Sequence, residues 1–405
     1  MQTASEQEKV TIPASQAGAA LERVSLMQFD AKCYRSLCIQ LLNVQNALNK
    51  EPDWGKTTSY GSLFVMLSLD MTVFIDGSLK LLGKIRGNKV DVDGITGCVG
   101  FEQRLKSVRN SMHLYNKQGP YYSKAKRILS EIRGLHHTDT KDFLYLFRND
   151  EALVYEIGNE YRYLRGALGM FYRHVLDYSK FAWTNDDQVN YSQHVAAIVN
   201  TFAKTKSDFV PEIDASILSF NEIRIESFDD KIADLFSSVP ITEETALRLM
   251  LILTRISYAI FIYKVFIEGS SVSNSPEWLV FFTKWFAMHL DEVIDSIDNL
   301  LRYSIGEDQK FLVLLFSDIN LFPRAEIQVV IRNLRNLIHY DIVGLSNKTT
   351  HFHSTEIDCL YLFKSACRLS SLSEILELFE EILRSLFAIQ TCLCHAFGEK
   401  GIVKL

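Results

Sequence analysis

The stretch Ile-Arg-Asn-Leu-Arg-Asn-Leu-Ile-His-Tyr-Asp, residues 331–341, decides the fold expected for this chain. At the helical rotation of about 100° per residue, its polar side chains fall on one stripe. That stripe holds Arg332, Arg335, Asn336 and His339. The opposite side carries the apolar residues Ile327, Val330, Ile331, Leu334, Leu337 and Ile338. The spacing predicts an amphipathic helix whose apolar face is buried.

The chemistry of this stripe is unusual, because it carries no acid until Asp341. Arginine binds phosphate oxygens through two parallel hydrogen bonds, and histidine can transfer a proton near neutral pH. Together these groups can cleave a phosphodiester without a metal. The structural alternatives are a solvated surface helix and a polar seam between two helices.

Composition limits the protein class. The chain has 405 residues, of which 47% are hydrophobic and seven are proline, enough for a large helical core. Its net charge of −6 does not indicate a nucleic-acid binder, so a phosphate site must be local. The seven cysteines include no Cys-x-x-Cys pair, which favours buried reduced thiols in a cytoplasmic protein.

No membrane segment is expected. Residues 1–17 are polar, lack a signal-peptide core and are predicted to be flexible. The longest apolar run, 249–266, is interrupted by Arg255 and Lys264, which is typical of a buried helix rather than a bilayer span.

Helical periodicity dominates the chain and predicts an all-α fold. The helices are expected at 18–49, 62–85, 101–116, 122–135, 141–179, 195–203, 242–267, 278–303, 356–366 and 371–397. Residues 220–225 fit a short strand or an extended loop, and the apolar run 310–316 is of uncertain type. The predicted organisation is a helical domain at 18–182, a linker or less regular segment at 183–240 and a second helical domain at 241–405.

A short motif occurs twice. Arg109-Asn110-x-x-His113 returns as Arg335-Asn336-x-x-His339, 226 residues later. Two long apolar helices and a variable loop precede each copy. A repeat of this length indicates duplicated domains rather than a solenoid.

At these residues the sequence resembles the HEPN superfamily of small α-helical bundles, many of which are RNases of prokaryotic defence, toxin–antitoxin and CRISPR systems. The family signature is an Arg, often followed by a polar residue, and a His after four to six intervening residues. Arg332-Asn333 with His339 fits the widest spacing. Arg335 to His339 is one residue shorter than that range, as is Arg109 to His113 in the first half.

The resemblance implies two HEPN-like bundles whose motif helices face one another and form a composite site. That pairing could occur within one chain or between two subunits of a homodimer. The implied activity is metal-independent endoribonuclease cleavage by the ribose 2′-OH, with no cofactor. His339 would be general base or acid, Arg332 or Arg335 would hold the phosphate, and Asn336 would orient His339 or a phosphate oxygen. Arg109, Asn110 and His113 would be the first-half counterparts.

The resemblance also suggests a bacterial defence effector of the abortive-infection, toxin–antitoxin or CRISPR-associated kind, controlled by a regulatory protein or antitoxin. Contacts to RNA are expected from Tyr340, Lys106, Arg162 and Arg165. The histidine clusters at 136–137 and 351–353 have a weak resemblance to metal sites, and no metal is predicted. The alternative function is a catalytically inactive helical scaffold that binds a partner protein or a nucleotide.

Overall fold

The computed structural model describes residues 14–48, 60–86, 89–112, 149–157, 160–164, 185–204, 210, 212–218, 223–231, 241–268, 275–317, 325–338 and 371–396. The first part contains α1 (Ala14–Leu48), α2 (Tyr60–Arg86), α3 (Val92–Thr96), α4 (Phe101–Met112), β1 (Asn149–Ile157) and β2 (Glu160–Leu164). There follow α8 (Asn185–Ala203), η1 (Ala215–Ile217), β3 (Ile223–Lys231), α9 (Glu243–Phe261) and the π-helical turn η2 (Ile262–Glu268). The last elements are α10 (Pro276–Tyr303), α11 (Gly306–Phe316), α12 (Ala325–Ile338) and α14 (Leu372–Ala396).

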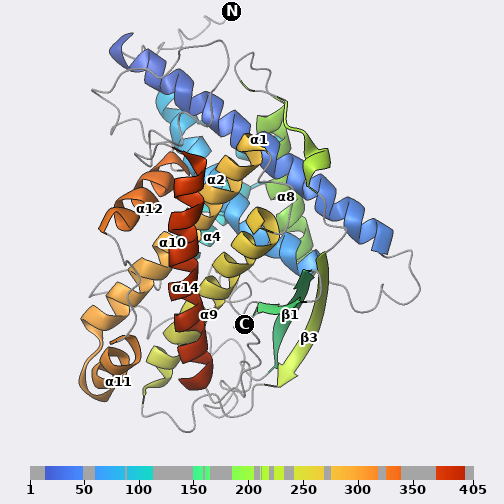
Figure 1. Ribbon diagram of the computed structural model, residues 1–405. Helices are drawn as coiled ribbons and strands as arrows, with labels where there is room; N and C mark the ends of the chain where they lie inside the picture. The colour runs from blue at the N-terminus through green and yellow to red at the C-terminus, as the bar shows by residue number, and fades with distance from the viewer. Residues whose placement is uncertain are drawn as a thin grey trace, which may run out of the picture.

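The helices form two packed groups (Figure 1). In the first group, α1 packs on α2, α4 packs on α2, and α8 packs against both long helices. In the second group, α9 packs on α10, α12 packs on α10, and α14 packs along α9. The two groups share one hydrophobic core, which runs from Leu26 in α1 to Leu393 in α14.

Aromatic rings fill the junction between the groups. The ring of Tyr34 in α1 contacts Phe281 and Trp285 of α10, with centroids 4.8 and 6.2 Å apart. Phe282 stacks on Phe266 at 4.8 Å. These rings bury large apolar areas, which makes the junction a major source of stability.

The second group begins with a well-capped helix. Thr242, the N-cap of α9, accepts a hydrogen bond from the backbone N–H of Thr245 at 3.3 Å. Asp308 of α11 accepts from the Thr242 hydroxyl and the Thr245 hydroxyl, both at 2.6 Å. The start of α9 is thereby bound to α11.

The helix predicted at 141–179 is wrong where the structure describes it. Residues 149–157 and 160–164 are strands β1 and β2, and β3 pairs with the other edge of β1, giving an antiparallel sheet of order β2-β1-β3. β1 is rich in residues that favour strands, and Gly158-Asn159 between the strands is a hairpin-type sequence. Of the two alternatives for residues 220–225, the strand is confirmed by β3 for residues 223–225, the part that the structure describes.

The segment 183–240 is more regular than the predicted linker. Within it, α8 packs on α1 and α2 and buries Tyr191, Val195, Ile198 and Phe202. Their spacing of three and four residues is helical, which explains why this segment belongs to the core. The first helix also begins earlier than expected, at Ala14.

The described part of the chain is therefore predominantly helical, as predicted, with one small sheet that an all-α description omits. Among the residues described, no helix combines the length and the apolar character that crossing a bilayer requires.

Candidate functional site

Helix α12 is amphipathic as the sequence predicts. Ile327, Val330, Ile331 and Leu334 are all buried, at 0–2% exposure. Arg332 and Asn336 are exposed on the other side. The apolar face packs on α10, so the polar stripe lies along the outer edge of that contact.

Arg335 is partly sequestered by an acid of α10. Its Nε donates to Oδ2 of Asp291 at 2.7 Å, and the arginine side chain retains 31% exposure. Burial raises the pKa of Asp291, and the Arg335 guanidinium opposes that rise. The charge pair fixes the direction of Arg335, whereas Arg332 remains exposed three residues earlier.

The first-half motif arginine has a similar environment. Nε of Arg109 on α4 lies 3.7 Å from Oδ2 of Asp76 on α2, and its side chain is only 11% exposed. That distance is too long for a hydrogen bond, and Nε has no hydrogen-bond partner. Burial lowers the pKa of Arg109, Glu292 and Asp76 oppose this, and nearby Arg255 and Arg335 lower it further.

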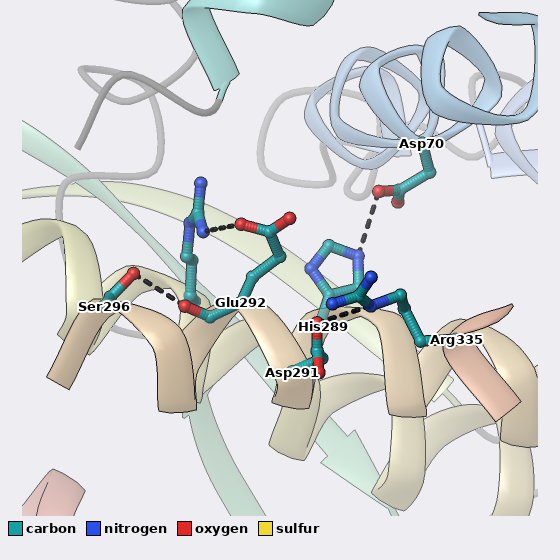
Figure 2. A network of polar contacts seen from close by, with 7 residues as sticks. Asp70, His289, Asp291, Glu292, Ser296 and Arg335 are labelled. Carbon is teal, nitrogen blue, oxygen red and sulfur yellow. Dashed lines mark hydrogen bonds and ion pairs between the residues drawn. The ribbon is translucent and has the colours of Figure 1, made fainter. Parts of the chain in front are cut away.

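The two motif arginines therefore influence one another electrostatically, from α4 and α12. Both arginines are affected by acids of α10: Asp291 pairs with Arg335, and Glu292 acts on Arg109. Glu292 also accepts a hydrogen bond from Nη1 of Arg255 at 2.9 Å (Figure 2). Burial and the neighbouring Glu292 raise the pKa of Asp295, one turn further along the same helix. Positive and negative groups alternate across this region, so it is not a simple basic patch.

A buried carboxylate stands beside this region and was not anticipated. Asp70 of α2 is 1% exposed and accepts at Oδ2 from the Tyr258 hydroxyl (2.9 Å) and the Trp285 indole N–H (2.7 Å). Its Oδ1 lies 2.9 Å from Nε2 of His289, a short contact that is poorly aligned for a hydrogen bond. Figure 2 shows the imidazole rising from α10 towards Asp70.

The sequence does contain a signal for the contact between Asp70 and His289. Asp70 interrupts the apolar run Leu67–Phe74, and His289 interrupts the run Leu279–Leu290. A charged or titratable residue inside an apolar helix is buried only when it has a partner. Periodicity places both positions in the core but does not show which residues pair with them.

Several predicted site residues lie elsewhere or outside the described residues. Lys106 is on the exposed side of α4 and forms an ion pair with Glu102. Arg162 is on strand β2 opposite Tyr155, not on the helix that was predicted at 141–179. The backbone of Asn110 is in α4. His113, His339, Tyr340 and Arg165 lie outside the described residues.

No group of three or more His, Cys, Asp or Glu side chains suited to a metal occurs within the described ranges. In comparisons with known proteins, no family model matches the chain, and neither a curated protein nor a solved structure matches it.

Proposed function

We propose that this protein is a metal-independent endoribonuclease of HEPN type. The observation that carries the proposal is the electrostatic influence of Arg335 on Arg109, since the two residues belong to the two copies of the Arg-Asn-x-x-His motif. Two motif helices that converge on one region are what a composite site requires. Although 226 residues separate the two arginines, the charge of Arg335 is among the causes that lower the pKa of Arg109, which supports this proposal.

Matching contacts in the two halves support an internal duplication. Asp76 of α2 pairs with Arg109 of α4, as Asp291 of α10 pairs with Arg335 of α12. In each half the aspartate lies on the second long helix and the arginine on the motif helix that packs against it. The motifs correspond to one another together with the acids that hold them.

The contacts across the junction are also reciprocal. Asp70 and Trp285 each lie six residues before the aspartate of their half, and they contact one another directly. Tyr34 of α1 contacts Trp285, while Tyr258 of α9 contacts Asp70. Reciprocal contacts of this kind are typical of a two-fold interface. They favour a composite site assembled within one chain rather than between subunits of a dimer.

In the proposed reaction, the 2′-OH of RNA attacks the adjacent phosphorus and expels the 5′-oxygen, leaving a cyclic phosphate. His339 transfers a proton. Arg332 and Arg335 bind the phosphate and stabilise the charge that develops on it. Asn336 orients the histidine or a phosphate oxygen, Tyr340 stacks on a base, and the first-half motif supplies Arg109, Asn110 and His113. DNA lacks the 2′-OH and is not a substrate.

The biological setting belongs to the same proposal. An RNase of this kind would act in the bacterial cytoplasm as a defence effector, with RNA as substrate and a regulatory protein or antitoxin as partner. The acidic side of α10 suits such control, because acids beside Arg332 and Arg335 oppose RNA binding until the charges are rearranged.

One observation favours the alternative, a catalytically inactive scaffold. Both Arg109 and Arg335 face carboxylates, and Arg109 is almost fully buried. In a scaffold, these ion pairs would only hold the motif helices against α2 and α10. The two functions differ in whether Arg332, which is exposed, and the motif histidines His113 and His339 act on RNA.

The decisive experiment incubates purified protein with mixed cellular RNA in the presence of EDTA. The parent is compared with His339→Ala and with a matched control, His194→Ala, whose ring packs on Phe101 of α4 at 5.1 Å. We expect cleavage with cyclic-phosphate ends by the parent and the control, and none by His339→Ala. Equal cleavage by all three proteins would remove His339 from the site, and no cleavage by the parent would leave the scaffold as the better interpretation.

A further inference from the structure

The imidazole of His289 is oriented by a carboxylate buried at the junction of the two halves. Nε2 faces Oδ1 of Asp70 at 2.9 Å, and the ring of Tyr258 packs edge-on against the imidazole at 4.7 Å. Asp70 is itself fixed by the indole N–H of Trp285 and the hydroxyl of Tyr258. The ring therefore has contacts with residues of α2 and α9 as well as with its own helix.

This arrangement leaves one ring nitrogen available. Within the described residues, the polar contact of the imidazole is made through Nε2, and the side chain keeps 11% exposure. A carboxylate beside Nε2 favours the tautomer that carries its proton on that nitrogen. Nδ1 then has a free lone pair and can accept a proton. The same carboxylate stabilises the imidazolium that results.

His289 also lies on the same helix as the two acids that act on the motif arginines. Asp291 and Glu292 follow it within one helical turn, so their backbones are about 5 Å from that of His289. Asp291 holds Arg335, and Glu292 is the strongest electrostatic neighbour of Arg109. Figure 2 shows His289 and Glu292 on the same side of α10. The imidazole thus lies on the side of α10 that carries Glu292, the acid that acts on Arg109.

The position of His289 carries a different type of residue in the two halves of the proposed duplication. His289 lies two residues before Asp291, and the matching residue of the first half, two before Asp76, is Phe74. Phe74 packs on Tyr34 at 5.3 Å as His289 packs on Tyr258. The apolar member shows that the fold does not need an imidazole at this position. Its presence in the second half, together with Asp70, calls for another explanation.

We infer that His289, oriented by Asp70, is the general base of the proposed ribonuclease. This inference rests on the proposed function and assigns one proton transfer within it. The 2′-OH proton passes to Nδ1 of His289, the O2′–P bond forms and the P–O5′ bond breaks. The departing O5′ takes a proton from His339. The second half thus supplies the base from α10 and the acid from the motif.

The test compares His289→Gln with His339→Gln, and with His194→Gln as the matched control. Each protein is given an oligoribonucleotide with oxygen at the scissile 5′ position and one with sulfur there. Sulfur departs without protonation, so it restores a variant that lacks the acid but not one that lacks the base. Glutamine retains a donor towards Asp70, and circular dichroism verifies the fold of each variant.

The expected result is that His289→Gln cleaves both substrates at least about 100-fold more slowly than the parent, while His339→Gln recovers on the sulfur substrate. Cleavage by His289→Gln at the parental rate, or its recovery on the sulfur substrate, would overturn the inference and leave the ribonuclease intact. Failure of the parent to cleave either substrate would overturn the ribonuclease itself.

A second measurement does not need turnover. Diethyl pyrocarbonate modifies free imidazole nitrogens, and peptide mapping locates the modified histidines. We expect an uncleavable 2′-deoxy oligonucleotide to slow the modification of His289 and not that of His194. Modification of His289 that is unaffected by the oligonucleotide would show that its Nδ1 does not face the substrate and would overturn the inference.

Discussion

Trp285 of α10 donates its indole N–H to Oδ2 of Asp70 on α2 at 2.7 Å, inside the core where the two helical groups meet. The carboxylate is 1% exposed and also accepts from the Tyr258 hydroxyl. A charge with so little exposure is tolerated only because donors replace its lost water. The relative placement of the two groups thus depends on polar contacts as well as on ring packing.

Replacing Asp70 should lower stability strongly. In Asp70→Ala, the buried Tyr258 hydroxyl and Trp285 N–H lose their acceptor, and breaking a buried charged network costs about 3–5 kcal/mol. Urea unfolding measures the loss. The exposed acid Glu307, paired with Lys310 on the surface, provides the control, because Glu307→Ala should change stability by less than about 0.5 kcal/mol. A similar loss in both variants would contradict this account of the junction.

A second buried charge crosses the junction. Lys284 of α10 forms an ion pair with Asp30 of α1, with side-chain exposures of 2% and 4%. Lys284→Met leaves the carboxylate without its cation, and we expect a loss of about 3–5 kcal/mol. The double variant Lys284→Met/Asp30→Leu removes both charges and should lose less than Lys284→Met alone. Unfolding free energies that simply add would show that the two charges are not coupled.

Cys38 should be inert in the folded protein. Its thiol donates to the sulfur of Met71 at 3.8 Å, and burial raises its pKa to about 12. At pH 8 only about one thiol in ten thousand is then the reactive thiolate. Brief iodoacetamide treatment, followed by peptide mass spectrometry, should label the half-buried Cys98 well before Cys38. Equal labelling without denaturant would contradict the packing of α1 against α2.

Much of the helical architecture follows from sequence periodicity. The buried face of α12 was predictable because Ile327, Val330, Ile331 and Leu334 recur at helical spacing. Burial of this apolar face decides which side of the helix packs on the core. The start of α9 was predictable because Thr242 is a strong N-cap type. Both predictions depend on local pattern alone.

The missed features depend on long-range contacts. Residues 149–157 form a strand because β2 and β3 pair with both edges, and such pairing is not visible within a short window. Asp70 and His289 meet across 219 residues, so neither position alone reveals the other. The prediction named the motif arginines but could not foresee that Asp76 and Asp291 face them.

Asp295 should make stability depend on pH. Burial and the nearby Glu292 raise its pKa in the folded protein above the unfolded value. A raised carboxyl pKa means that the folded state binds the proton more tightly, so stability falls as pH rises from the unfolded pKa through the folded pKa. Asp295→Asn removes this penalty and should be more stable than the parent at pH 7. Urea midpoints should converge below about pH 4, and an unchanged difference there would contradict the assignment.

The two arginines of the second motif should differ in what their loss changes. Arg332 is exposed, so Arg332→Gln should leave unfolding unaffected and lower kcat/KM for RNA by about 100-fold or more if it binds the phosphate. Arg335→Gln leaves Asp291, which is 13% exposed, without its cation and should also lower stability by about 1–3 kcal/mol. The double variant Arg335→Gln/Asp291→Asn should recover most of that stability without recovering cleavage. Full cleavage by Arg332→Gln would assign the phosphate to Arg335 alone.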